Sequence, residues 1–127
     1  MLKILVVEDN KDLNTILVKR LEHEGFSVGS LVDGYALLSH LMDGEEPDAV
    51  ILDLMLPGRS GLELLNTMVS KWKKARIFIF SAHSEYEKRH MLRECNISGY
   101  ICKSDGIDKL IEKIKAEFEE SGEGEEE

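Results

Sequence analysis

The chain has 127 residues, 43% of them hydrophobic and 32% charged, so one domain can form and bury a continuous core of its own. No apolar run is long enough to cross a bilayer, and the first residues lack the apolar segment and cleavage site of a signal peptide. The net charge is −9 and there is no basic patch, so we expect no binding to nucleic acids. The lack of an export signal and the position of Cys102 in an apolar run, which suits a reduced thiol, indicate a cytoplasmic protein that does not bind membranes.

Short apolar runs and amphipathic helical patterns alternate along the first half of the chain. A helix is indicated where apolar residues recur on one helical face, and a strand where they run without interruption. In chain order we expect a strand at Lys3–Val7, a helix at Asp12–Glu24, a strand at Phe26–Val32, a helix at Tyr35–Met42 and a strand at Ala49–Leu52. The first of these strands stops at an acidic pair, and the third stops at Asp53.

The same alternation continues through the second half. After a loop at 54–60 we expect a helix containing Leu62, Leu65, Met68 and Val69, a strand at Ala75–Phe80, a helix at Glu85–Cys95, a strand at Gly99–Cys102 and a helix from Ile107 to Phe118. Five strands, each followed by a helix, predict one α/β domain with a parallel sheet and helices on both faces. We place this domain at residues 1–118. Residues 119–127 contain six glutamates and two glycines and are expected to be a disordered acidic tail.

Polar side chains occur at the ends of four of the five predicted strands. They are Glu8 and Asp9, Asp53, Ser81 and Lys103. The ligand site of an open α/β sheet lies beyond the carboxyl ends of its strands, so we expect these five side chains to converge. Taken singly, each has a structural explanation as a helix cap, a loop residue or a surface charge. Five such residues at four strand ends are hard to explain that way.

The converging residues predict magnesium-dependent phosphoryl chemistry. Clustered carboxylates repel one another unless a cation joins them, and oxygen-only ligands suit Mg²⁺. The carboxylate of Asp53 is a competent nucleophile that would form an acyl phosphate. Lys103 and Mg²⁺ would share the charge on the phosphoryl oxygens, and Ser81 would donate a hydrogen bond to one of them.

Four segments resemble the receiver domain of two-component response regulators: VVEDN at 6–10, LDLMLPGRSG at 52–61, FSA at 80–82 and GYICKS at 99–104. The resemblance extends from residue 1 to about 118 and lies in the ordered set of segments. It implies a doubly wound, flavodoxin-like or CheY-like sheet of five parallel strands in the order 2-1-3-4-5. It also implies a chain that catalyses only its own aspartyl phosphorylation and dephosphorylation and is otherwise not an enzyme.

The resemblance assigns roles to the residues at the strand ends. It makes Asp53 the phosphoacceptor and makes Asp9 a direct ligand of Mg²⁺. Glu8 would act on the metal largely through water, and Met55 would contribute its backbone carbonyl. No organic cofactor is implied.

A switch and a set of partners are implied in the same way. Ser81 would move toward the phosphoryl group, and the ring of Tyr100 would turn inward behind it. The changed surface would control a downstream output domain or protein. The phosphoryl group would come from the phosphohistidine of a sensor histidine kinase or a phosphotransfer protein. The sequence does not indicate an oligomeric state.

The sequence departs from the common receiver pattern at two places. The acidic pair is Glu8-Asp9 instead of two aspartates, although the longer glutamate can still reach a metal-bound water. Ser104 stands where most receivers have a proline. A cis bond before a non-proline residue costs about 3–4 kcal/mol, so we expect the Lys103–Ser104 bond to be trans. We also expect Ser104 or Asp105 to cap the last helix.

Other functions fit the sequence less well. A haloacid-dehalogenase-type phosphatase needs a second aspartate two residues after the nucleophile, where this chain has Met55. An FMN-binding protein would find its phosphate repelled by the acidic pair. A hydrolase built from Ser81, His83 and Asp53 lacks the nucleophile elbow. A receiver-like interaction module that is never phosphorylated is the remaining alternative, although all the site residue types are present.

Overall fold

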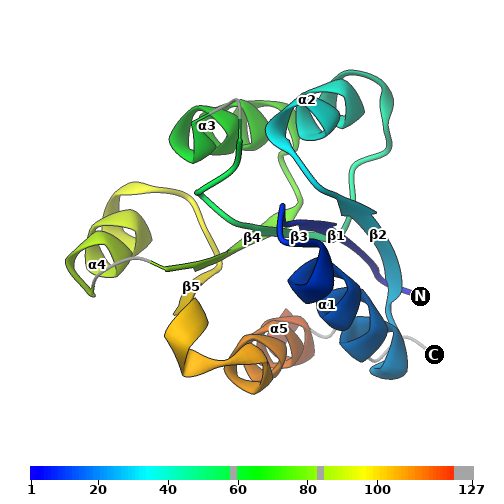
Figure 1. Cartoon of the computed structure of the whole chain (residues 1–127). Coiled ribbons are helices and arrows are strands. Elements are labelled where there is room, and N and C mark those ends of the chain that lie inside the picture. The colour runs from blue at the N-terminus through cyan, green and yellow to red at the C-terminus, as the bar shows by residue number, and fades with distance from the viewer. Residues whose placement is uncertain (58–59, 83–84, 122–127) are drawn as a thin grey trace.

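The structure of the chain, a computed structural model, describes residues 1–57, 60–82 and 85–121. Its sheet consists of β1 (Lys3–Val7), β2 (Ser27–Leu31), β3 (Ala49–Leu52), β4 (Arg76–Ser81) and β5 (Gly99–Cys102). The strands pair in parallel in the order β2-β1-β3-β4-β5 (Figure 1). The fold class and the strand order are therefore the predicted ones, with β1, β3 and β4 in the interior of the sheet.

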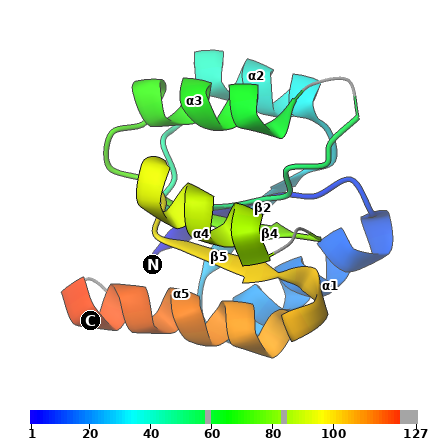
Figure 2. The ribbon, with the colours of Figure 1, turned by 90° about the vertical axis from the view of Figure 1, so that its left-hand side faces the viewer.

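Helices cover both faces of this sheet. They are α1 (Lys11–His23), α2 (Gly34–Asp43), α3 (Gly61–Lys71), α4 (Glu85–Glu94) and α5 (Ile107–Ser121). Figures 1 and 2 show α1 and α5 on one face and α2 and α3 on the other, with α4 toward the β5 side. A short 3₁₀ turn, Lys103–Asp105, joins β5 to α5.

Alternating side chains of the interior strands point to opposite faces of the sheet and pack in two separate core clusters. Val6 and Ile51 pack with Leu17 of α1 in one cluster, which also receives the apolar side of α5. The next residues along, Val7 and Leu52, pack in the second cluster with α2, α3 and Met91 of α4. Because β3 is buried at every position, its sequence AVIL reads as a continuous apolar run.

Side-chain caps fix where the first two helices begin. The Oδ1 atom of Asn10 accepts the N–H of Leu13 at 3.1 Å, and Oδ1 of Asp33 accepts the N–H of Ala36 at 2.8 Å. Each cap satisfies a backbone donor that has no partner within its helix. The two caps hold the first turns of α1 and α2 at the carboxyl end of the sheet.

The single tryptophan of the chain, Trp72, ends α3 at the amino end of the sheet. Its indole is 5% exposed and belongs to the cluster under α2 and α3. The ring of His40 from α2 approaches it edge-on, with ring centroids 5.8 Å apart. This contact joins the C-terminal turns of α2 and α3.

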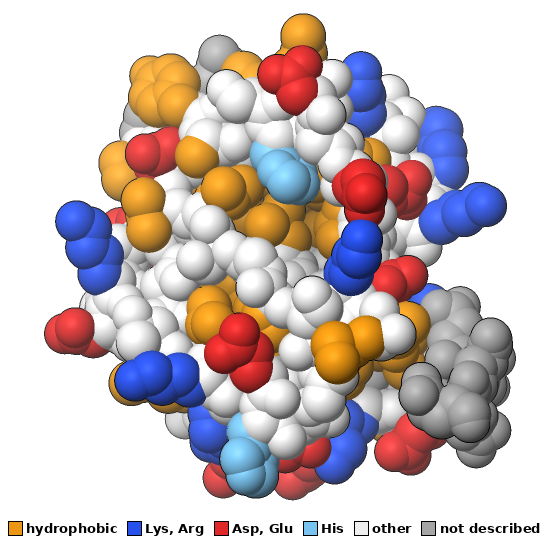
Figure 3. Space-filling model, turned by 90° about the vertical axis from the view of Figure 1, so that its right-hand side faces the viewer, with side chains coloured by type: hydrophobic (Ala, Val, Ile, Leu, Met, Phe, Trp, Pro, Cys, Tyr) orange, Lys and Arg blue, Asp and Glu red, His pale blue; other side chains and the backbone are white. Residues whose placement is uncertain are grey.

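The edge strand β2 differs from the interior strands in its burial. Its residues are exposed or half-buried, and its sequence SVGSL carries two serines and a glycine. The face of the molecule on this side is largely polar and backbone surface across its middle, with scattered charges and smaller hydrophobic areas (Figure 3). The polar composition suits a strand that pairs on only one side.

Most element boundaries lie within two residues of the prediction, and the differences are at the C-terminal end. Helix α5 continues to Ser121, three residues past the expected domain boundary; residues 122–127 lie outside the described residues. The Lys103–Ser104 bond is trans, as expected, since the described chain contains no cis peptide. The predicted cap by Ser104 or Asp105 is not found: these residues form the 3₁₀ turn, and Gly106, at φ 93°, precedes α5. No helix in the described part of the chain is long and apolar enough to cross a membrane.

Candidate functional site

Three carboxylates meet at the carboxyl end of the sheet. Glu8 and Asp9 follow β1, and Asp53 follows β3, the neighbouring strand. Each offers a carboxylate oxygen, and these oxygens all lie within 4.8 Å of one another. Glu8 and Asp53 are buried, whereas Asp9 is exposed. The structure therefore brings together the acidic residues that the sequence singled out.

Hydrogen-bond donors surround the Asp53 carboxylate. Its Oδ1 atom accepts the hydroxyl of Ser81 at 2.9 Å and the backbone N–H of Met55 at 3.0 Å. Its Oδ2 atom accepts the ammonium of Lys103 at 2.7 Å. The side chain of Asp53 is only 3% exposed, so these donors replace the water that a surface carboxylate would have. Both oxygens are thus held in fixed directions.

The Lys103 ammonium bridges two buried carboxylates. Besides Asp53, it lies 3.0 Å from Oε1 of Glu8. Burial by itself lowers the pKa of Lys103, but the hydrogen bonds to Asp53 and Glu8 outweigh burial and raise its pKa above the ordinary value. The lysine therefore stays charged at any physiological pH and neutralises part of the acidic cluster.

Glu8 is more enclosed than the sequence alone suggested. Its side chain is 2% exposed, and burial raises its pKa, although hydrogen bonds from the backbone N–H of Asn10 and from Lys103 oppose that rise. The Asn10 N–H donates to Oε2 at 3.0 Å, and Lys103 contacts Oε1. Both oxygens of Glu8 thus already have protein partners, which leaves it fewer free lone pairs for a metal-bound water than Asp9 has.

Two residues that shape the site were not singled out from the sequence. Asn14 is buried on α1, and its side-chain amide donates to the backbone carbonyls of Glu8 and Leu31. Gly61 opens α3 against the backbone of Leu54; a Cβ atom there would lie 2.5 Å from the Leu54 Cα. Asn14 lies on the same face of α1 as the buried Leu17 and Leu21. A polar residue at such an apolar position was the sequence feature that could have identified it.

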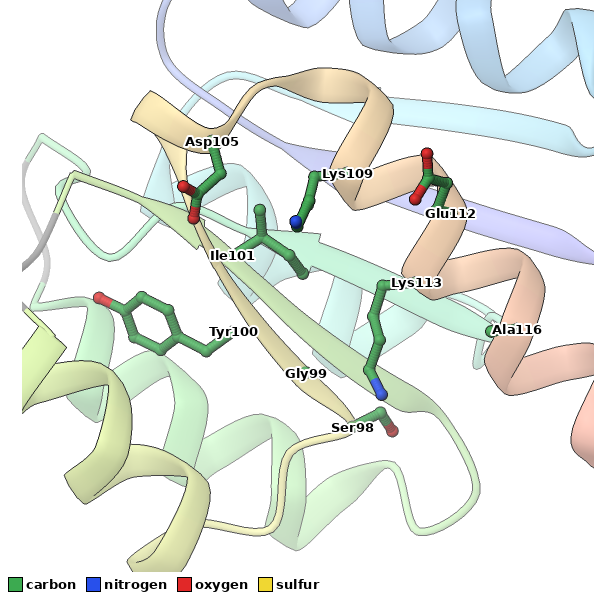
Figure 4. Close-up of a pocket in the computed structure, with 9 residues that line it drawn as sticks. All are labelled: Ser98, Gly99, Tyr100, Ile101, Asp105, Lys109, Glu112, Lys113 and Ala116. Atoms are coloured by element: carbon green, nitrogen blue, oxygen red, sulfur yellow. The ribbon is translucent and has the colours of Figure 1, made fainter.

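The proposed switch residues lie on neighbouring strands. Ser81 ends β4, and Tyr100 lies on β5, where its side chain is 3% exposed. Burial raises the pKa of the Tyr100 hydroxyl well above its usual value, and the nearby Cys102 and Asp53 add to the rise. Figure 4 shows the Tyr100 ring directed away from α5. It packs in the same cluster as Met91 of α4, so the ring already lies inward.

A shallow groove runs along the outer side of β5 and α5. It has a volume of about 480 Å³ and is lined in part by Tyr100, Ile101, Lys109 and Lys113 (Figure 4). None of the three clustered carboxylates lines it. The groove is therefore a surface feature beside β5 and separate from the acidic site.

The residues present fit a divalent cation at the acidic cluster. Carboxylate oxygens are the donors that Mg²⁺ prefers, and three of them lie within reach of one another. Asp9 is open to solvent, so it can bind an ion that keeps several waters. Met55 lies beside the cluster through its N–H bond to Asp53. His83, which entered one alternative built from the sequence, lies outside the described residues.

Known proteins share the sequence pattern and the fold of this chain. A model of the response regulator receiver domain family matches residues 4–115 of the chain. The response regulator TrrA of Thermotoga maritima, solved in complex with Mg²⁺-BeF, is 35% identical with a TM-score of 0.78; the match covers 91% of this chain and 98% of that one. The BeF₃-activated N-terminal receiver domain of RstA from Klebsiella pneumoniae is 27% identical with a TM-score of 0.79, covering 90% and 96%. DrrB, an OmpR/PhoB homolog from Thermotoga maritima, is 26% identical with a TM-score of 0.83, covering 95% and 54%.

Proposed function

The chain belongs to the family of response regulator receiver domains of two-component signalling, and from that premise we propose that Asp53 accepts the phosphoryl group. One observation carries this assignment. The Asp53 carboxylate is buried, flanked by Glu8 and Asp9, and held by donors on both of its oxygens. As a receiver domain, the chain is not an enzyme beyond its own phosphorylation chemistry.

The reaction is a transfer from a phosphohistidine to the aspartate. A carboxylate oxygen of Asp53 attacks phosphorus, an O–P bond forms, and the bond between phosphorus and the donor's histidine nitrogen breaks. Lys103, 2.7 Å from Oδ2, is close enough to follow the negative charge onto the phosphoryl oxygens. The hydroxyl of Ser81 and the N–H of Met55 can donate to the same group.

We assign the metal site to Mg²⁺. Asp9, Asp53 and the backbone carbonyl of Met55 would hold the ion, and Glu8 would act on it through water. Bound there, Mg²⁺ would neutralise the charge that builds up on the transferring group. The oxygen-only donor set and the solvent-open Asp9 support this choice.

The output would depend on Ser81 and Tyr100. Phosphorylation would pull the Ser81 hydroxyl from Asp53 toward the phosphoryl group, and the ring of Tyr100, on the neighbouring strand, would respond to that movement. Because the Tyr100 ring packs in the same cluster as Met91 of α4, a change at this ring would alter the surface around α4. The partners would be a histidine kinase or phosphotransfer protein and an output domain or protein in the cytoplasm.

Mass spectrometry after incubation with Mg²⁺ and acetyl phosphate tests the assignment. We expect the mass to rise by one phosphoryl group, and we expect no rise in Asp53→Asn. Asp43→Asn, on the exposed end of α2, is the matched control and should gain the group as the wild type does. An unmodified wild type would leave the chain as a receiver-like interaction module. Repeated turnover of unrelated phosphate esters would indicate a phosphatase.

A further inference from the structure

We propose that Asn14 is a positioning residue of the phosphoryl site: from α1 it fixes the backbone of Glu8, and through Glu8 it fixes the ammonium of Lys103. The inference rests on the proposed role of Asp53 and adds to it a residue that touches none of the reacting atoms. It also gives the buried Glu8 a role that is separate from metal binding.

The side-chain amide of Asn14 joins two strand ends. Its Nδ2 atom donates to the carbonyl of Glu8 at 3.0 Å and to the carbonyl of Leu31, the last residue of β2, at 3.1 Å. The backbone N–H of Glu8 donates to the same Leu31 carbonyl at 3.1 Å. Asn14 is 5% exposed, so water cannot readily take over these bonds. An amide nitrogen carries the two protons that this arrangement needs; the similarly shaped leucine carries none.

The fixed Glu8 in turn orients the lysine. The backbone N–H of Asn10, at the cap of α1, holds Oε2 of Glu8 at 3.0 Å, which leaves Oε1 facing Lys103 at 3.0 Å. The ammonium then reaches Oδ2 of Asp53 at 2.7 Å. The first turns of α1 therefore hold Glu8 at both its backbone and its carboxylate. A rotation of the Glu8 backbone would displace the lysine from Asp53.

A purely structural role for Asn14 makes a different prediction. A buried amide that only satisfies two carbonyls would stabilise the fold without affecting the lysine. Loss of Asn14 would then lower stability alone, as the loss of any packed residue of α1 does. Val18 provides the comparison, because it is half-buried on the same helix and packs in the cluster between the sheet, α1 and α5.

The experiment compares Asn14→Leu with Val18→Ala in the full chain. The first measurement is the ¹⁵N–¹H signal of the Lys103 ammonium in the unphosphorylated protein without metal, assigned by its loss in Lys103→Met. The second is the rate of phosphorylation by acetyl phosphate at saturating Mg²⁺. The midpoint of urea unfolding is recorded for each variant to match their stabilities. Asn14→Ser, which keeps one donor, covers the case in which Asn14→Leu does not fold.

We expect Asn14→Leu to lose or shift the ammonium signal and to phosphorylate about 10- to 100-fold more slowly than the wild type. Asn14→Ser should fall between the two, and Val18→Ala should keep both the signal and the rate. A variant of Asn14 that keeps the wild-type signal and rate would overturn the proposal. If the wild type is not phosphorylated, the proposed function fails, and the ammonium signal still decides whether Asn14 positions the lysine.

Discussion

Carboxylates lie at both ends of the sheet, but they differ in their burial and in their hydrogen-bond partners. At the amino end, Glu46 accepts the backbone N–H groups of Lys74 and Ala75, each at 2.7 Å. Asp48 accepts the backbone N–H of Lys3 at 2.7 Å. At the carboxyl end, two buried carboxylates and one exposed carboxylate converge near a single ammonium.

The carboxylates at the two ends of the sheet differ in their electrostatic cost to the folded state. Carboxylates that are exposed or half-buried and accept backbone N–H groups stabilise the local structure and carry little electrostatic cost. A buried cluster with more negative than positive charge costs free energy in the folded state, and any cation that joins it recovers part of that cost. The carboxylates at the amino end therefore stabilise the fold, whereas the acidic cluster at the carboxyl end fits the cation and the transferring group that we propose for it.

Removing the Lys103 ammonium at the carboxyl end should have the largest effect of the substitutions proposed here. We expect Lys103→Met to slow phosphorylation by acetyl phosphate on the order of 100-fold, because the charge on the phosphoryl oxygens loses its positioned partner. Intact-mass time courses at saturating Mg²⁺ measure the rate. Lys109→Met, at an exposed position on α5, serves as the control. A rate equal to the wild type would contradict the role given to Lys103.

Removing the exposed acid should separate binding from folding. We expect Asp9→Ala to weaken Mg²⁺ binding by at least about tenfold, since it deletes a ligand. The urea midpoint should stay the same or rise, because one like charge leaves the cluster. Isothermal titration calorimetry gives the affinity. Unchanged Mg²⁺ affinity would remove Asp9 from the metal site.

A methyl group at Gly61 should disturb the loop that carries the reactive residues. The added carbon would lie 2.5 Å from the Leu54 Cα and would also clash with the Leu54 carbonyl, so the backbone next to Asp53 must shift. We expect Gly61→Ala to cost about 1–3 kcal/mol of stability and to slow phosphorylation. Gly29→Ala is the control, because its new carbon meets only Leu5 Cδ1 at an ordinary 3.7 Å. Equal stability of the two variants would show that the backbone at Leu54 can shift without a cost in free energy.

Removing the Glu46 carboxylate at the amino end should affect stability alone. Glu46→Ala removes the acceptor of two backbone hydrogen bonds and should lower the free energy of unfolding by about 1–2 kcal/mol. The phosphorylation rate should be unchanged. Urea titration and the mass assay test both halves of the prediction. A slower reaction would mean that the two ends of the sheet are coupled.

The smallest effect is expected at the Lys3–Glu45 ion pair, which is exposed. A hydrogen bond from Lys3 holds the pKa of Glu45 below its ordinary value. Any stability from this pair is therefore present above that ordinary pKa and is lost as pH falls through the lowered one. We expect Glu45→Gln to leave the urea midpoint at neutral pH within error. A clear loss at pH 7 would mean that the pair is stronger than its exposure implies.

The sequence was sufficient for the sheet and for the identity of the acidic cluster. An unbroken apolar run such as Ala49–Leu52 is typical of a strand that is buried on both faces of a parallel sheet. A polar residue directly after such a strand lies at the carboxyl end of the sheet. The strand order came from the family resemblance, because local patterns do not specify which strands pair. The pairing of Glu8 with Lys103 joins residues far apart in the chain and depends on tertiary structure.

Two local differences between the prediction and the structure lie at the C-terminal end. The turn after β5 was predicted to cap the last helix, but Lys103–Asp105 closes a 3₁₀ turn instead and leaves Gly106 before α5. Glutamates at 119 and 120 were assigned to a tail on their charge, yet α5 runs through them to Ser121. Glutamate has a high helix propensity, so an acidic run that follows a packed helix can extend it.

The position of Trp72 has a consequence for optical measurements. It is the only tryptophan and follows α3 at the amino end of the sheet, beside His40. Gly61, at the start of α3, and Asp53, after β3, lie at the opposite end of the sheet. Its emission should therefore follow unfolding of the α2–α3 layer and change little when metal or a phosphoryl group arrives. Fluorescence would then measure stability in every variant above without interference from the chemistry.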